Sequence, residues 1–340
     1  MTNLVTGASG FVGSHVVRRL LARGESVRVL VRPSSVLRAI EKLPIERVYG
    51  DLRDAASLRE AVRGVHRVFH VAADYRLWSA DRRSIYESNV TGTRNILDAA
   101  HQAGVEKVVY TSSVATIAVH RPDLLPNEAT QAGLAEMIGD YKRSKFLAEQ
   151  EALKAAQAGA PVVVVNPTTP VGPADWKPTP TGKIILDFLR GKMPAYLDTG
   201  LNLVPVEDVA EGHLLAAERG KAGQRYILGG VNLTLKEILE CLARITGRTA
   251  PKVQLPYAVA YAAGLVENSI ARVLGREPQI PMDGVRMARH KMFVDASRAP
   301  RELGFVAASV EDALARAVRW YEENGYVATR AARGAVGVAA

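Results

Sequence analysis

The stretch TGASGFVG, from Thr6 to Gly13, decides the fold. It follows a short β-like run, NLVT, and leads into VGSHVVRRLLARG, whose apolar residues recur at helical spacing. Glycines at positions 7, 10 and 13 permit a tight turn and let a diphosphate approach the backbone closely. The following helix turns its free N–H groups and its positive dipole end towards such an anion. The stretch therefore predicts a dinucleotide-binding loop, with GxxGxxG spacing in place of GxGxxG.

The same strand–helix alternation continues through the first half of the chain. Val-rich, β-like runs alternate with helical patterns that end in Gly, and this order indicates an α/β fold with a doubly wound parallel sheet. From Pro167 the chain is rich in Pro, Thr and Gly, and later it is mostly helical. We therefore predict a Rossmann domain over 1–166 with returns near 203–230, a smaller, mostly helical substrate lobe over 167–202 and 231–326, and a disordered tail over 327–340.

Composition and charge restrict the class of partner. The 340-residue chain is 48% hydrophobic and 23% charged, which is ordinary for a globular protein. Its net charge of +9 is spread along the chain without interleaved aromatic runs, which favours an anionic small molecule over nucleic acid. Cys241 is the only cysteine and the N-terminus shows no signal-peptide pattern, so we expect a cytoplasmic protein. We expect no metal ion in the site.

One later stretch, YAVAYAAGLV from Tyr257 to Val266, is strongly apolar. It is well short of the ~20 residues that span a bilayer, so we expect no transmembrane segment. Our first interpretation is a helix packed within the protein. The alternative is a surface that contacts lipid or a lipid-like substrate, which leaves peripheral membrane contact open.

The end of the second strand distinguishes between the two nicotinamide dinucleotides. NAD sites place an acidic residue about 20 residues after the glycine loop, where it binds the ribose 2′-hydroxyl. Here that end reads VLVRPSS, and Arg32 offers a guanidinium suited to a 2′-phosphate, with Ser34, Ser35 and Arg38 as further donors. The sequence favours NADP over NAD, and the alternative for Arg32 is an exposed loop residue. Asp51, after the third strand, is assigned to the adenine amino group or, alternatively, to a helix cap.

Tyr141 and Lys145 stand four residues apart in GDYKRSKFLAEQ, so they share one face of a helix. A phenol has a pKa of about 10 and is a poor base at neutral pH, but a neighbouring ammonium can lower that pKa. Ser112 and Ser113, in YTSSVAT, follow the fifth strand at the sheet edge where open α/β sheets bind ligands. The pattern predicts proton exchange by Tyr141 while a serine holds the substrate oxygen. A solvated helix face is the alternative.

In this order, TGASGFVG, GDLRD, HVAA, YTSS, YKRSK and NPTTPVGP resemble the extended short-chain dehydrogenase/reductase family over nearly the whole chain. The resemblance implies a triad of Ser113, Tyr141 and Lys145. It also implies that Asn89 helps to hold a proton-relay water, with a helix cap or a buried polar residue as the alternative. Together with the residues above, the expected cofactor contacts are Gly7, Ser9, Gly10, Phe11, Val12, Gly13, Arg32, Ser35, Arg38, Asp51, Leu52, Val71, Ala72, Ala73, Ser112, Tyr141, Lys145, Pro167, Thr168 and Thr169.

A narrower resemblance bears on the reaction. HVAADYRLW, YKRSKFLAE, MPAYLDTGLNLV and GVRMARHKMF are similar to the bacterial hopanoid-associated sugar epimerases, a subgroup close to dihydroflavonol-4-reductase-like proteins. That resemblance implies sugar epimerisation through transient oxidation by a retained cofactor. Arg32, and the missing Arg-x-Gly-Asp-type segment of many sugar-nucleotide epimerases, favour net redox chemistry on a carbonyl or secondary alcohol instead. A third hypothesis is a noncatalytic NADP sensor, although such proteins typically lose the tyrosine or lysine.

We expect substrate contacts from the segment after the fourth strand and from the loops that bridge the lobes. They are Asp74, Tyr75, Trp78, Ser113, Trp176, Tyr196, Asn202 and Arg286. Packing between the lobes is the alternative for all of these side chains except Ser113 and Arg286, and a solvated face is the alternative for Arg286. The family resemblance also implies a homodimer formed by the helices that contain Asn89–Ala103 and Tyr141–Ala156. The residues expected to pack in that interface are Ala99, Ala100, Leu147 and Ala148.

Overall fold

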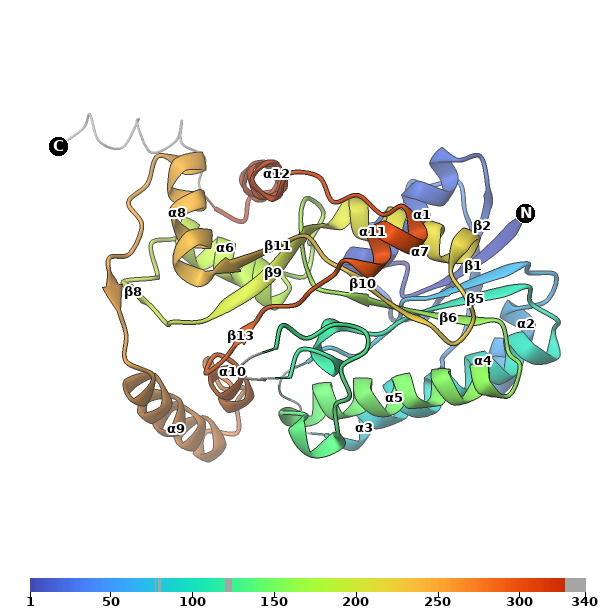
Figure 1. The fold of residues 1–340 in the computed structure, drawn as a ribbon, viewed down its shortest axis with the longest axis horizontal. Helices are drawn as coiled ribbons and strands as arrows, with labels where there is room; N and C mark the ends of the chain where they lie inside the picture. Colours follow the sequence, from blue (N-terminus) through green and yellow to red (C-terminus); the bar gives the residue numbers. More distant parts are fainter. Residues whose placement is uncertain (77, 79–80, 120–123, 328–340) are drawn as a thin grey trace.

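A computed structural model describes residues 1–76, 78, 81–119 and 124–327 of the chain. A larger lobe built on a parallel sheet lies beside a smaller lobe formed mainly by the C-terminal part of the chain (Figure 1). The tail predicted over 327–340 lies outside the described residues, apart from Val327. That residue is buried in the core of the smaller lobe, so the prediction of disorder does not apply to it.

Within the described residues, seven strands form one parallel sheet in the order β10-β6-β5-β4-β1-β2-β3. Their bounds are β1 Thr2–Thr6, β2 Ser26–Val31, β3 Glu46–Tyr49, β4 Arg67–His70, β5 Lys107–Thr111, β6 Val162–Pro167 and β10 Arg225–Leu228. The strand order reverses between β1 and β4, where Thr6 is level with His70 and the two following loops diverge. This is the switch point of a doubly wound sheet, and the predicted fold class is confirmed.

Helices cover both faces of this sheet (Figure 1). One face carries α1 (Phe11–Ala22), α7 (Val206–Arg219) and α11 (Arg298–Leu303), and the other carries α2 (Ala55–Ala61), α4 (Gly92–Gln102) and α5 (Gly139–Gln157). The strands are apolar on both sides because both faces are covered, and the Val run of β6 is fully buried. Each such valine contributes about 1.5–3 kcal/mol of burial free energy.

The smaller lobe contains a second sheet in addition to the predicted helices. Its order is β11-β9-β13, with β7 also paired to β9, and a short β8–β12 pair lies apart. The strands are β7 Thr169–Val171, β8 Ala195–Tyr196, β9 Gly200–Pro205, β11 Val231–Thr234, β12 Val253–Gln254 and β13 Lys291–Met292. The helices are α6 Pro180–Leu189, α8 Leu235–Thr246, α9 Tyr257–Val273, α10 Met282–Met287 and α12 Val310–Glu323. Thus β9 joins this lobe, whereas α11 packs back on α7 and β10 of the larger one.

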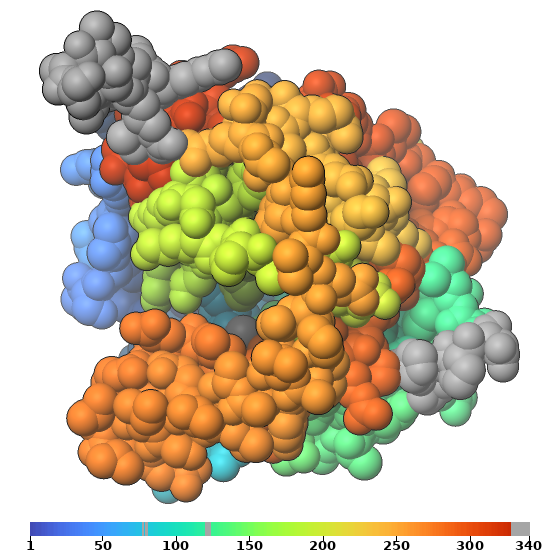
Figure 2. Space-filling view, turned by 90° about the vertical axis from the view of Figure 1, so that its left-hand side faces the viewer, coloured from blue at the N-terminus to red at the C-terminus, as the bar shows by residue number. Residues whose placement is uncertain are grey.

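The apolar stretch at Tyr257 forms α9, but this helix is not packed within the protein. Its only buried residues are Gly264 and Ala271. Val259, Val266 and Val273 recur every seven residues and are 51%, 60% and 86% exposed. α9 packs against α10 and stands out at one end of the molecule (Figures 1 and 2). The packed-helix interpretation is therefore wrong, because the apolar face points outwards.

The helices α4 and α5 lie side by side on the sheet. Ala99, Ala100 and Ala148 are buried beneath them in the core of the larger lobe, and of the four expected interface residues Leu147 alone keeps partial exposure. The three alanines therefore pack against the sheet and are not accessible to a partner subunit.

Candidate active site

The glycine loop joins β1 to α1 at the switch point of the sheet. Gly7 has φ +69°, and a Cβ atom there would lie 2.6 Å from the backbone nitrogen of Ala72. A Cβ atom at Gly13 would lie 2.2 Å from the carbonyl oxygen of Gly7. Both positions exclude any side chain, so the loop packs tightly between the end of β4 and the start of α1.

The N-terminus of α1 is suited to bind an anion. Gly10 is its N-cap, with no side-chain hydrogen bond, and the first turn of this described helix holds no acidic residue. Ser9, Phe11 and Val12 are partly accessible and Gly10 is exposed. The free N–H groups and the positive dipole end of the helix therefore fit the diphosphate of a dinucleotide.

Arg32 directly follows β2, beside the glycine loop. Its backbone N–H donates to Ser35 Oγ over 3.0 Å, and its carbonyl accepts from the Ser35 N–H over 2.9 Å, which closes a turn. Among the described residues nothing pairs with the exposed guanidinium. Arg38 differs, because its guanidinium lies 3.8 Å from the centre of the Trp176 ring. We predict Arg38 as a cofactor contact and Trp176 as a substrate contact. In the structure these two side chains contact each other between the lobes.

Asp51 follows β3 and binds Arg53 through two 2.9 Å hydrogen bonds, from Nε to Oδ1 and from Nη2 to Oδ2. The hydrogen bond with Arg53 lowers the pKa of this carboxyl below its ordinary value. Asp54 caps α2 by accepting from the Ala56 N–H. The alternative of a helix cap at Asp51 is therefore wrong, and its contact with adenine stays a prediction.

The remaining residues expected on the cofactor lie at the carboxyl edge of the sheet. After β4, the backbone N–H groups of Val71 and Ala72 donate to the carbonyl and hydroxyl oxygens of Thr6, over 3.3 and 3.2 Å. The Thr168 N–H donates to the carbonyl of Leu228 over 3.1 Å. The others lie nearby: Ala73 is partly accessible, Leu52 packs beside α4, Ser112 follows β5, Pro167 ends β6 and Thr169 begins β7.

Lys145 lies fully inside the larger lobe, on the sheet-facing side of α5. Its Nζ donates to the Tyr110 hydroxyl over 3.0 Å and to the Thr111 carbonyl over 2.7 Å. Burial lowers the pKa of Lys145 to about 7, although the charge of Glu149 acts in the opposite direction. The ammonium is thus held at the end of β5 by two fixed acceptors.

Tyr141 is one helical turn before Lys145 and lies beside Ser113. Burial raises the pKa of the Tyr141 phenol above its ordinary value, and a side-chain hydrogen bond with Ser113 acts in the opposite direction. The expected lowering by Lys145 is not found, because that ammonium is directed at Tyr110 and Thr111. The structure therefore holds Tyr141 as a protonated phenol at neutral pH.

Asn89 lies in a single π-helical turn, Glu87–Thr91, ahead of α4. Its side-chain oxygen accepts from the Asp74 N–H over 2.7 Å, and its amide donates to the Asp74 carbonyl and to Ser144 Oγ, both over 2.9 Å. The residue is buried and fastens the segment after β4 to α5. It is not a helix cap, and its contact with a relay water stays a prediction. Such π-turns are frequent at functional sites.

Glu149 was not foreseen, and it completes the polar face of α5. The carboxylate is fully buried and accepts from Thr116 over 2.9 Å, from the Asn166 amide over 2.7 Å and from Arg225 over 3.1 Å. Asn166 also donates to the Ser113 carbonyl over 3.1 Å. The network therefore holds the serine loop against β6. The sequence offers one signal for Glu149, which is its position four residues after Lys145.

The comparisons with known proteins agree with this geometry. The family model described as the NAD dependent epimerase/dehydratase family matches residues 3–229. The chain belongs to this family. A protein of Synechocystis sp. named after dihydroflavonol 4-reductase is 52% identical over 330 residues, 96% of each chain. Sterol demethylase protein B of Methylococcus capsulatus is 38% identical over 329 residues, which cover 96% of this chain and 100% of that one.

A solved structure agrees as well. The crystal structure of a nucleoside-diphosphate-sugar epimerase from Pseudomonas aeruginosa has a TM-score of 0.80 and 28% identity, over 96% of this chain and 99% of that one. The resemblance found in the sequence is confirmed: this epimerase/dehydratase family member is an NAD(P)-dependent enzyme of the extended short-chain dehydrogenase/reductase type.

The residues expected on the substrate of this family member fall into two groups. Asp74 binds Arg76, while Tyr75 and Trp78 are 38% and 37% exposed beside it, at the carboxyl edge of the sheet. Arg286 is exposed on α10, 3.6 Å from Asp283. These side chains are open to a ligand.

The second group serves the smaller lobe itself. Asn202 is buried, donates to Asn232 and accepts from the Gly230 N–H, both over 2.8 Å. Tyr196 lies in β8 and packs on the lobe core, and Trp176 meets the Trp320 ring edge-on at 4.7 Å. In the structure Asn202, Tyr196 and Trp176 therefore pack within or between the lobes. Among the described residues no cluster of acidic, His or Cys side chains is arranged to hold a metal ion.

Proposed function

We propose that the protein is an NADPH-preferring reductase that acts on a carbonyl group, or in reverse on a secondary alcohol. The observation that carries this proposal is Arg32. Its exposed guanidinium has no partner among the described residues and stands at the end of β2, where an NAD enzyme places a carboxylate for the ribose 2′-hydroxyl. A planar guanidinium suits a 2′-phosphate, and it would leave the 2′-hydroxyl of NAD without an acceptor.

The fit of the other residues supports the same chemistry. The bound nicotinamide supplies or accepts the hydride. Ser113 is partly accessible and orients the substrate oxygen, and Tyr141 donates its proton to that oxygen. A phenol whose pKa is raised by burial is protonated and ready for this donation. Lys145, with a pKa lowered to about 7, can both give and take a proton at neutral pH.

Two measurements test this function. Calorimetric titration of the nucleotide-free protein with NADP⁺ and NAD⁺ is expected to show clearly tighter NADP⁺ binding. Tyr141→Phe is expected to lose turnover and keep cofactor affinity. Tighter NAD⁺ binding, or an NAD that stays bound through purification, would count against the reductase.

A sugar epimerase is the second candidate. The fold similarity to a nucleoside-diphosphate-sugar epimerase favours it. In that reaction Tyr141 would take a sugar hydroxyl proton and return it after the keto sugar has turned over, with no net change in the redox state of the cofactor. The similarity to a protein named for sterol demethylation supports a polycyclic lipid as the wider setting, in line with the hopanoid link.

We also propose that α9 contacts an anionic lipid surface. Its outward face carries the Val259–Val266–Val273 stripe together with exposed Ile270 and Leu274. Arg272 of α9 is exposed next to Val273, and the chain carries a net charge of +9, so the charges complement anionic headgroups. None of the described helices is long and apolar enough to cross a membrane. The contact is therefore peripheral.

The remaining proposals concern assembly and location. A homodimer would use the outer faces of α4 and α5, where Phe146 and Leu147 are partly exposed. The single cysteine, Cys241, is buried as a free thiol, which supports a cytoplasmic location.

A further inference from the structure

Lys142 is a buried lysine on α5 that the proposed reaction does not use. It is 7% exposed, and among the described residues no hydrogen bond or ion pair engages its ammonium. Lys145, on the same helix, is held by Tyr110 and Thr111 instead. An ammonium on a nearly buried side chain is poorly solvated when it has no partner, so a ligand that pairs with it would stabilise it.

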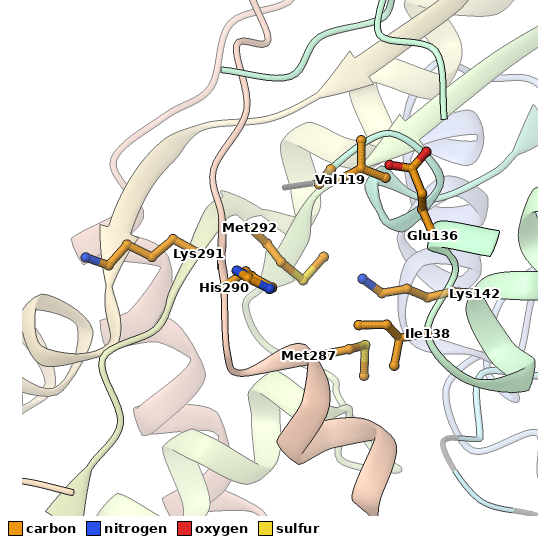
Figure 3. A pocket seen from close by; sticks show the side chains of 9 residues that line it. Val119, Glu136, Ile138, Lys142, Met287, His290, Lys291 and Met292 are labelled. Carbon is orange, nitrogen blue, oxygen red and sulfur yellow. The ribbon is translucent and has the colours of Figure 1, made fainter. Parts of the chain in front are cut away.

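The Lys142 side chain lines a cavity of about 190 Å³ between the two lobes (Figure 3). Most of the wall is apolar. Val119 comes from the segment after β5, Ile138 precedes α5, and Met287 and Met292 come from α10 and β13 of the smaller lobe. The wall therefore combines an apolar surface with four polar side chains, which are those of Glu136, Lys142, His290 and Lys291.

The other charged side chains of the wall point away from the cavity, so the Lys142 ammonium remains available to a ligand. Figure 3 shows the Lys142 ammonium pointing into the space beside His290, while the Glu136 carboxylate points away. Glu136 accepts from the Gly133 N–H over 2.8 Å. The Lys291 ammonium also points away from the cavity and pairs with Asp198. Among the charged side chains of the described wall, Lys142 is the one aimed inwards.

The position of α10 fixes this geometry. A Cβ atom at Gly139 would lie 2.3 Å from Oδ2 of Asp283, so the first residue of α5 and the start of α10 are in direct contact. Gly139 has φ +78°, which favours glycine there. The smaller lobe is thus seated on the N-terminus of α5, one turn before Lys142.

We propose that this cavity binds a carboxylate group on an otherwise apolar substrate, with Lys142 as the residue that pairs with it. One ammonium balances one negative charge, so a carboxylate matches it better than a phosphate dianion does. A cavity of about 150 Å³ holds a benzene ring, so the present volume takes a ring that carries a carboxylate. A second cavity, of about 310 Å³, shares Ile138 and His290 with the first and extends the space for a larger substrate.

The ionisation of Lys142 agrees with this role. Burial lowers its pKa to about 8, so the side chain remains mostly protonated at neutral pH. A bound carboxylate would favour the charged form further. The inference rests on the proposed function only in treating the cavity as the substrate site, because binding of the carboxylate needs no hydride transfer.

Calorimetry with a matched pair of probes tests the proposal. 2-Naphthoate and 2-naphthamide have nearly the same shape and differ in charge. We expect the wild-type protein to bind the acid about tenfold or more tightly than the amide, as for a hydrogen bond between charged groups. Lys142→Met keeps the length of the side chain and should remove this preference, whereas Lys142→Arg should retain part of it. Lys291→Met is the matched control and should leave the preference unchanged.

Several outcomes would overturn the assignment. They are equal binding of acid and amide by the wild type, binding of neither at millimolar concentration, and a preference that survives in Lys142→Met. Tighter binding of 2-naphthyl phosphate than of 2-naphthoate would replace the carboxylate by a phosphate. Melting curves confirm that each variant is folded, and Lys142→Gln replaces the methionine variant if that variant is not. The titration is repeated with Tyr141→Phe, so failure of the catalytic proposal and failure of the carboxylate site are read separately.

Discussion

Replacing Glu149 by alanine removes the carboxylate that joins α5 to the serine loop and to β10. The side chain is fully buried and accepts from Thr116, Asn166 and Arg225 over 2.9, 2.7 and 3.1 Å. In Glu149→Ala the Asn166 amide and the Arg225 guanidinium lose the charged acceptor, although the amide keeps the Ser113 carbonyl and the guanidinium keeps the backbone carbonyls of Glu128 and Thr130. We therefore expect a large loss of stability, and with it a looser Ser113 loop.

The size of the effect follows from the burial of the two charges. Breaking a buried ion pair by removing one partner costs about 3–5 kcal/mol. The Arg225 side chain is 18% exposed, so water partly solvates it and the expected loss lies near the lower limit, about 3 kcal/mol. For a chain of this size that corresponds to a fall in Tm of about 4 °C. Glu149→Gln keeps an acceptor and should lose about 1–2 kcal/mol.

Urea unfolding and thermal melting measure these differences, and Glu151→Ala is the matched control. Glu151 lies two residues further along α5 and pairs with Arg94 over 2.9 Å, but Arg94 is 54% exposed. Such a surface pair contributes about 0–1 kcal/mol. If Glu149→Ala and Glu151→Ala lose the same amount, the buried network does not stabilise the larger lobe as described.

Four further predictions concern the other charged and exposed groups. Burial lowers the pKa of Lys142 from 10.5 to about 8, so the unfolded chain binds more protons between these values and stability rises with pH there. Lys142→Met should then raise the free energy of unfolding by up to about 3 kcal/mol below pH 8, and by almost nothing near pH 10.5. Urea unfolding across this pH range measures the difference, and an effect that does not depend on pH would contradict the prediction. Tyr141→Phe should abolish turnover with cofactor affinity kept, and retained activity would exclude its role as proton donor. Arg32→Asp should shift calorimetric preference from NADP⁺ towards NAD⁺, and unchanged affinities would refute that contact. Val266→Asp should reduce co-sedimentation with phosphatidylglycerol vesicles but not stability, whereas loss of self-association instead would identify α9 as a contact between copies.

The larger lobe could be predicted because its signals are local. Each Val-rich run lies between helices that end in Gly, and parallel pairing follows from that order. The second sheet could not be predicted in the same way. The segment around β9 otherwise contributes to the main sheet. The strands that pair with β9 are β7, β11 and β13, and they are short or lie far from it in the sequence. A two-residue strand such as β13 carries no periodic pattern.

The candidate site shows the same division between local and distant signals. The glycine loop can be recognised within one turn, and the Tyr141–Lys145 pair within one helix, so both signals are local. Arg38 was assigned to the cofactor because it is basic and close to β2, but its contact is a tryptophan ring far along the chain. For α9, composition alone could not distinguish a buried helix from one that contacts lipid, because both are apolar. Glu149 could have been found, since it continues the four-residue spacing of Tyr141 and Lys145.

The helix α5 carries three buried charges in two different settings, and that difference guides the search for a substrate. Lys145 and Glu149 are held by fixed partners at the ends of β5 and β6, so the protein itself compensates them. Lys142 has no such partner among the described residues and faces a cavity that residues of the other lobe also line. Buried charges that the fold leaves uncompensated concentrate where a ligand completes the structure. The substrate is therefore better sought among apolar carboxylates that also carry a reducible carbonyl than among neutral sugars, and a first substrate screen should contain both.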